Sequence, residues 1–209
     1  MVKTGPDSLL AAAAELLDRG GPEAVTLRAV GLAAGVSRGA PYHHFATKTQ
    51  LLAAIAAREL DRLADAFLAV EGQGSIESQG APAAKAMMLI YLRWALEFPE
   101  RFRLTFGRWE EDDARLGLAA ARVREAFVAA VSRAQQDHEL PAGDPVRLAA
   151  LALSATHGAA DLAAAGHLGP DRTGTGRTGR IDGEGLVHDW FVHMRAAARG
   201  QQGPSSNLG

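Results

Sequence analysis

The sequence predicts an all-α protein, with an N-terminal three-helix helix-turn-helix domain followed by a C-terminal helical bundle. About a fifth of its 209 residues are alanine, which is the strongest helix former and a weak strand former. Aromatic residues, which favour strands, make up only 6% of the chain, and β-branched residues are also sparse. Sheets, barrels and βαβ nucleotide-binding folds are therefore not expected.

Composition also limits the classes of function. The chain has no cysteine, which excludes disulfide-stapled modules, thiol catalysis and thiolate metal sites. The net charge is −2, so any contact with nucleic acid must come from a local basic patch. The least polar stretch, 148–166, is mostly alanine and contains Asp161, which indicates a buried helix rather than a membrane span. A cytoplasmic protein without membrane contact is expected.

Four helices are expected in the first third of the chain. Thr26, Ser37 and Thr47 stand where N-cap residues are preferred, and Gly20 and Gly35 stand where helices end. The expected ranges are 8–19, 27–34, 38–44 and 48–70.

Five further helices are expected beyond a linker at 72–82, because apolar residues recur there at helical spacing. Asp144 is the N-cap of the fourth of them. The expected ranges are about 87–98, 100–106, 116–140, 145–166 and 182–199. A mobile glycine-rich loop is expected at 169–185 and a disordered tail at 200–209. The two domains are expected to span 5–65 and 80–199.

The informative segment is 26–45, where a short helix, a glycine-containing turn and a second short helix are expected. This arrangement is typical of a helix-turn-helix motif. Gly35 can adopt the positive φ that such a turn needs. The small Ala34 before it allows the two helices to approach, and Val36 after it fills the space between them.

Charge supports a nucleic-acid partner for the same segment. No Asp or Glu occurs between Glu23 and Glu59. The interval instead carries basic and titratable side chains, namely Arg28, Arg38, His43, His44, Lys48 and Arg58. Such a positive region attracts phosphates even in a protein of slightly negative net charge. A helix over 38–44 would be ~10 Å long and would fit a major groove ~12 Å wide.

The segment resembles the N-terminal domain of the TetR/AcrR family of bacterial transcriptional regulators. The family pattern is matched at Thr26, Leu27, Arg28, Val30, Ala34, Gly35, Val36, Ser37, Gly39, Pro41, Tyr42, His44, Phe45, Lys48 and Leu51. The one departure is Gly31, where the family usually has alanine. We expect this glycine to loosen the second helix slightly without altering its contacts.

The resemblance implies roles by position. Thr26, Tyr42 and Lys48 would contact phosphates, Phe45 would be buried, and residues around the second short helix would face the groove. The candidate DNA-binding residues are Thr26, Leu27, Ser37, Arg38, Gly39, Ala40, Tyr42, His43, His44 and Lys48.

The C-terminal part resembles the WHG-type regulatory domains of the same family, at 98–107 and at Thr156, His157 and Gly158. The tryptophan that usually precedes the His-Gly pair is absent, because Leu153 or Ser154 stands there. His157 is either a hydrogen-bonded core residue or a ligand contact. The candidate ligand-binding residues are Met88, Tyr91, Trp94, Phe102, Phe106, Phe127 and His157.

The sequence therefore predicts a ligand-responsive transcriptional regulator, a repressor that binds a palindromic operator as a homodimer. Dimerisation is expected through the helices 145–166 and 182–199, and the effector is expected to be a small apolar molecule. The alternative is a helical ligand-binding or interaction protein with a vestigial helix-turn-helix. No enzymatic activity, cofactor or metal is expected; the G-x-G-x-x-G at 174–179 follows no strand and opens no helix.

Overall fold

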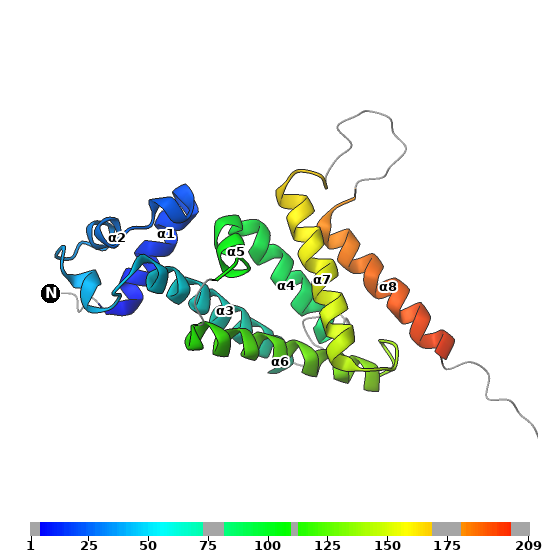
Figure 1. Cartoon of the computed structure of the whole chain (residues 1–209). Coiled ribbons are helices and arrows are strands. Elements are labelled where there is room, and N and C mark those ends of the chain that lie inside the picture. The colour runs from blue at the N-terminus through cyan, green and yellow to red at the C-terminus, as the bar shows by residue number, and fades with distance from the viewer. Residues whose placement is uncertain (1–4, 73–81, 110–112, 169–180, 202–209) are drawn as a thin grey trace, which may run out of the picture. The chain divides into compact units, whose positions relative to one another are not determined.

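A computed structural model of the chain describes residues 5–72, 82–109, 113–168 and 181–201. These residues form helices and no strand, which confirms the all-α fold (Figure 1). The elements are α1 (Pro6–Ala24), α2 (Leu27–Ala33), the 3₁₀ helix η1 (Ala40–His43), α3 (Lys48–Gly72), α4 (Ala83–Glu97), α5 (Pro99–Thr105), α6 (Ala114–Gln136), α7 (Pro145–Ala164) and α8 (Gly183–Gln201).

The chain divides into two compact units. The N-terminal unit comprises Met1–Ala64 together with Glu97–Val123, and the C-terminal unit comprises Asp65–Leu96 together with Arg124–Gly209. The division crosses α3 and α6, so each of these helices contributes to both units. Helix α5, expected within the C-terminal bundle, packs against α1 and belongs to the N-terminal unit.

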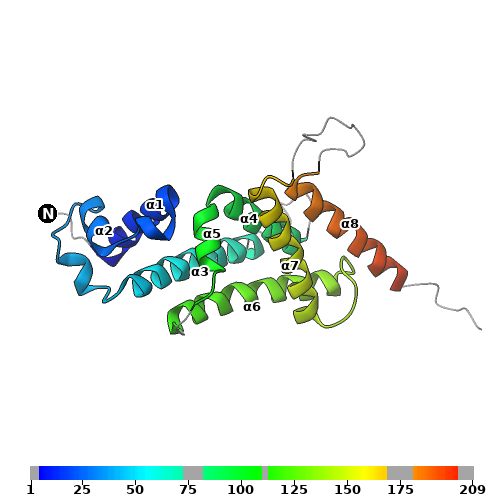
Figure 2. The same cartoon turned by 45° about the horizontal axis from the view of Figure 1, so that its top comes forward.

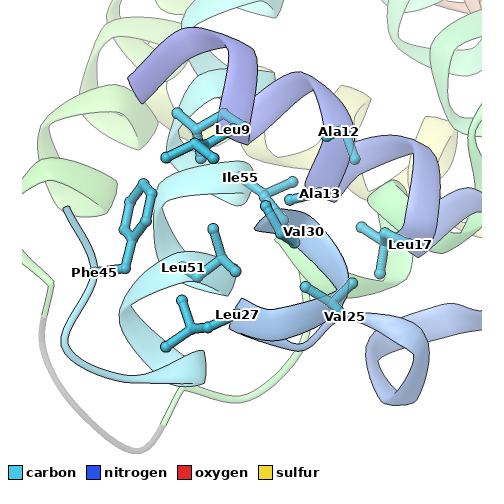
Figure 3. Packing of buried hydrophobic residues seen from close by; sticks show 12 residues of the cluster. Leu9, Ala12, Ala13, Leu17, Val25, Leu27, Val30, Phe45, Leu51 and Ile55 are labelled. Carbon is cyan, nitrogen blue, oxygen red and sulfur yellow. The ribbon is translucent and has the colours of Figure 1, made fainter. Parts of the chain in front are cut away.

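The core of the N-terminal unit is formed by α1, α2 and the start of α3. Figure 3 shows Leu9 and Leu17 of α1 directed toward Val30 of α2 and toward Leu51 and Ile55 of α3. These side chains are at most 1% exposed. Phe45, expected to be buried, closes the same cluster and is 8% exposed. The cluster fixes α2 and the segment after it against two longer helices.

Local capping explains where several helices begin. The side-chain oxygens of Thr26, Thr47 and Asp144 accept backbone N–H groups of the first turns of α2, α3 and α7, as expected from sequence. Helix α1 runs further than expected, to Ala24, but its backbone leaves helical geometry at Gly20 and Gly21, where the end was expected. The glycines thus break the helical geometry where the sequence predicts the helix end, and a further short turn follows to Ala24.

The C-terminal unit contains the end of α3, α4, the second part of α6, α7 and α8. Figures 1 and 2 both show α7 and α8 side by side, and the two helices are in contact. The start of α8 packs on α4, because a Cβ at Gly183 would lie 3.1 Å from the methyl carbons of Leu92. Arg93 of α4 also holds Glu184 of α8, at 2.7 Å.

Some expectations fall outside the described residues. The structure does not describe residues 73–81, 169–180 or 202–209. The expected linker at 72–82 is therefore described only at its two end residues. The expected loop at 169–185 is too long, because Gly183 already begins α8. Among the described helices, none combines the length and the low polarity that a membrane span requires.

Candidate nucleic-acid interface

The start of α2 is an exposed, capped helix N-terminus. The Thr26 hydroxyl accepts the Ala29 N–H at 3.1 Å, and Thr26 itself is exposed. Leu27 is different, because its side chain is only 8% exposed and belongs to the core. The first-turn N–H groups of a helix have no intrahelical partner. Leu27 can therefore offer a phosphate its backbone N–H but not its side chain.

The end of α2 is a Schellman turn built around Gly35. The Val36 N–H donates to the carbonyl of Gly31 at 3.0 Å, and the Gly35 N–H donates to that of Leu32 at 3.1 Å. Gly35 has φ +67°, the left-handed conformation that glycine adopts without strain and that we expected from the sequence. Val36 is half-buried and packs against the core.

The element after the turn is shorter than the sequence predicts. The α-helix expected over 38–44 is instead the four-residue 3₁₀ helix η1. Its N-cap is Gly39, so the expectation that Ser37 caps it is wrong; the Ser37 carbonyl accepts the Ala40 N–H at 3.0 Å instead. Pro41 accounts for this geometry, because it has no N–H for an α-helical bond and its fixed φ suits a helix start.

Burial divides η1 and its flanks into anchors and exposed side chains. Pro41 is buried, as Phe45 is, whereas Tyr42 is 57% exposed. Its exposed neighbours are Ser37, Arg38, Gly39, His43 and His44, and Ala40 is half-buried. The side chains that the sequence assigns to the DNA groove are therefore accessible from solvent, and they include an arginine and two histidines.

The start of α3 adds a second helix N-terminus. Gln50 donates its N–H to the Thr47 hydroxyl at 3.1 Å, and its side-chain oxygen accepts the Ala46 N–H at 3.0 Å. Lys48, the first residue of α3, lies 3.4 Å from the carboxylate of Glu23, whose side chain is 94% exposed. This ion pair is solvent-exposed and therefore weak. The Lys48 ammonium can exchange this partner for a phosphate.

Arg58 has a different role from the other basic residues of the segment. It is half-buried and donates to the backbone carbonyl of Asp7 at 3.1 Å. Burial, together with the charge of Arg62, lowers the pKa of Arg58. The residue therefore ties α3 to α1 within the N-terminal unit.

An ionic cluster inside the N-terminal unit is not evident from the sequence. Arg101 of α5 binds Asp18 of α1 through two nitrogens, at 2.9 and 2.6 Å, and its third nitrogen is 3.4 Å from both carboxylate oxygens of Glu59. Glu59 is 2% exposed and also binds Arg62 at 2.9 Å. Burial opposes the charge on Arg101, but the bond to Asp18 and the charge of Glu59 raise its pKa.

The candidate ligand-binding residues are divided between the two units. In the C-terminal unit, the Tyr91 hydroxyl is 2.7 Å from Nδ1 of His157, and Trp94 meets the Tyr91 ring edge-on. Nε2 of His157 lies 3.6 Å from Asp161. Burial raises the pKa of Tyr91, so its phenol keeps its proton beside His157.

The other candidates have simpler surroundings. Met88 is buried in the C-terminal unit, and Phe127 packs there against Phe67. Phe102 and Phe106 form an aromatic pair in the N-terminal unit, with ring centroids 5.4 Å apart. The structure thus brings together Tyr91, Trp94 and His157 but does not unite the whole set.

Comparison with known proteins identifies both parts of the chain. Residues 9–55 match the model of the bacterial regulatory proteins of the tetR family, and residues 84–177 match that of the tetracyclin repressor-like C-terminal domain. No curated protein matches the chain.

Solved structures share the fold over almost the whole length. A Rhodococcus sp. RHA1 protein of unknown function is 26% identical, with a TM-score of 0.74, over 93% of this chain and 96% of its own. SmeT, the repressor of the Stenotrophomonas maltophilia multidrug efflux pump SmeDEF, is 22% identical, with a TM-score of 0.59, over 93% and 90%. Reduced E. coli NemR is 17% identical, with a TM-score of 0.61, over 91% and 95%. The helix-turn-helix geometry and the two family matches together establish that this chain belongs to the tetR family of DNA-binding transcriptional regulators.

Proposed function

We propose that the protein is a ligand-responsive repressor that binds a palindromic operator as a homodimer, with η1 in the major groove. The observation that carries this proposal is the surface formed by η1 and the starts of α2 and α3. It exposes Arg38, Tyr42, His43 and His44 above a fixed core, and no carboxylate occurs in the sequence between Glu23 and Glu59.

The surface offers two kinds of contact. Thr26, Tyr42 and Lys48, together with the N–H groups that begin α2 and α3, suit phosphates, because helix N-termini attract anions. Leu27 contributes here only through its backbone. The residues proposed to contact base edges are Ser37, Arg38, Gly39, Ala40, His43 and His44. Arg38 carries the greatest capacity for discrimination, because a guanidinium can bind guanine through two hydrogen bonds.

Dimerisation is proposed through α7 and α8, which cover the expected helices 145–166 and 182–199. Leu151 and Leu162 of α7 are 63% and 46% exposed, and Val192 of α8 is 48% exposed. Exposed alanines, among them Ala150 and Ala155, accompany the leucines on α7 and allow close helix approach. Two such helices from each subunit would form a four-helix bundle, and its two-fold symmetry calls for a palindromic operator.

The effector site is proposed at Tyr91, Trp94 and His157, where aromatic rings surround one imidazole. A mostly apolar molecule with one hydrogen-bonding group suits this chemistry. By reciprocity, a ligand that weakens operator binding must itself bind less tightly when the operator is present. Tryptophan fluorescence titrations of apolar compounds, with and without operator, measure this coupling; a ligand unaffected by Trp94→Ala and His157→Ala would place the site elsewhere.

Selection of duplexes from a random pool by the purified protein tests the DNA-binding part. We expect an enriched motif with two-fold symmetry and half-site centres about 34–36 Å apart, one turn of DNA. A protein whose helix-turn-helix is only structural would enrich no motif.

A further inference from the structure

Gly31 of α2 lies directly against the ring of Pro41 in η1. A Cβ at position 31 would be 3.1 Å from Cγ and 3.4 Å from Cδ of Pro41. Favourable carbon–carbon contacts lie at about 3.5–4.0 Å. The Pro41 ring therefore occupies space that a side chain at position 31 would need.

The backbone of Gly31 has little freedom to make room. Its carbonyl accepts the Val36 N–H at 3.0 Å and so forms the long bond of the Schellman turn. A Cβ at Gly31 would also lie 3.6 Å from the carbonyl oxygen of Ser37. Gly31 is buried, and its neighbour Val30 is completely buried in the core. Any side chain at position 31 must therefore displace Pro41 rather than α2.

Pro41 in turn fixes the exposed residues of η1. Its carbonyl accepts the N–H groups of His44, at 3.1 Å, and of Phe45, at 2.9 Å. The adjacent Tyr42 and His43 are exposed, whereas Pro41 itself is buried. A displacement of the Pro41 ring is therefore passed to the exposed side chains of Tyr42 and His43, which follow it in the chain.

We propose that Gly31 is a positioning residue for DNA reading: its missing side chain seats Pro41 and so sets how η1 presents Tyr42 and His43. This inference rests on the proposed function of η1. It corrects the expectation that Gly31 only loosens α2, because the contact with Pro41 depends on this glycine.

The test compares Gly31→Ala, Pro41→Ala and the double variant with the wild type. Gly117→Ala is the matched control, because Gly117 is also helical and a Cβ there would meet nothing within 4 Å. Two quantities are measured for each protein: affinity for the selected operator relative to a scrambled duplex, and the melting temperature.

We expect Gly31→Ala to lower operator affinity about tenfold, within the range of one lost base contact. Affinity for the scrambled duplex should fall less, because only Tyr42 of the two displaced residues is proposed to contact phosphate. Pro41→Ala removes both ring carbons that the new methyl would meet. In the Pro41→Ala background, Gly31→Ala should therefore cause no further loss, and the double variant should bind as Pro41→Ala does. Gly117→Ala should bind both duplexes like the wild type and melt higher, because alanine favours the helix.

Wild-type operator affinity in Gly31→Ala, or a double variant in which the two losses add, would overturn the inference. The melting temperatures test the contact without DNA. If the changes caused by the two single variants are added to the wild-type melting temperature, the double variant should melt ~2–4 °C above that value, the shift that ~1 kcal/mol of coupling gives in a chain of this size. Additive melting temperatures would equally overturn it. A wild type that selects no motif would refute the proposed function, while the melting data would still decide the contact.

Discussion

Lys48 illustrates how single side chains on the proposed interface are held before DNA arrives. Its ammonium lies 3.4 Å from Glu23, whose side chain is 94% exposed, and its own side chain is 37% exposed. A pair this exposed contributes little to stability and can be exchanged. The residue is thus available to a phosphate at the start of α3.

Lys48→Ala should weaken binding to all duplexes alike. A dimer would lose two phosphate contacts, so the slope of log K against log salt concentration should become less steep by roughly 2. Glu23→Gln is the matched opposite change: it removes the competing carboxylate and should strengthen binding to every duplex. A slope unchanged by Lys48→Ala would remove Lys48 from the interface.

Arg38→Ala should change sequence preference rather than overall affinity for DNA. Arg38 is exposed in the turn before η1, and a side chain bound to a base edge discriminates by ~1–3 kcal/mol. Repeating the duplex selection with the variant should show relaxed preference at one position of each half-site. Uniform weakening on all sequences would identify Arg38 as a phosphate contact instead.

At the level of elements, the sequence predicted what depends on neighbours along the chain. Thr26, Thr47 and Asp144 cap helices because N-capping is a local hydrogen bond, and Gly35 takes the turn conformation that only its own backbone decides. The 3₁₀ geometry of η1 differs from the α-helix that the sequence pattern predicts, and Pro41 is the residue that signals the difference, because it has no N–H to donate.

Contacts between elements could not be predicted from the same patterns. Asp18, Glu59 and Arg101 stand far apart in the sequence, and each alone is an ordinary charged residue of a helix. Gly31 and Pro41 were both noted, but their contact depends on how α2 and η1 pack. Tyr91 and His157 were both candidates, and only the structure shows the 2.7 Å contact that joins them.

Arg101→Met should destabilise the protein by about 3 kcal/mol, because it removes a partner from the buried carboxylate of Glu59. Arg62 still binds Glu59, which places the loss at the lower end of the range for buried pairs. The neighbouring Arg103→Met is the control, since its pair with Glu100 lies on the surface and should contribute less than about 1 kcal/mol. Urea unfolding measures the free energy of unfolding of both variants. Equal losses would mean that the ionic cluster around Arg101 stabilises the protein no more than a surface ion pair does.

At the scale of the whole molecule, the proposed function depends on two copies of the chain. The exposed leucines of α7 are explained if a second subunit covers them. The wild type should therefore sediment as a dimer at micromolar concentration, and Leu151→Glu should sediment as a monomer, because it would bury a charge in the interface. Leu118→Glu is the control, since Leu118 of α6 is 70% exposed and lies outside the proposed interface. A monomeric wild type, or a dimeric Leu151→Glu variant, would contradict the assignment of α7.

In the proposed function, η1 and the helix starts around it read an operator. Binding of the wild type to its selected operator and to a scrambled duplex of the same length, each measured over a range of salt concentrations, tests this claim most directly. We expect both affinities to fall with salt, because phosphates are contacted in each case, and the operator to bind at least ~10³-fold more tightly at physiological salt. Equal affinity for the two duplexes, or binding that does not depend on salt, would contradict the account.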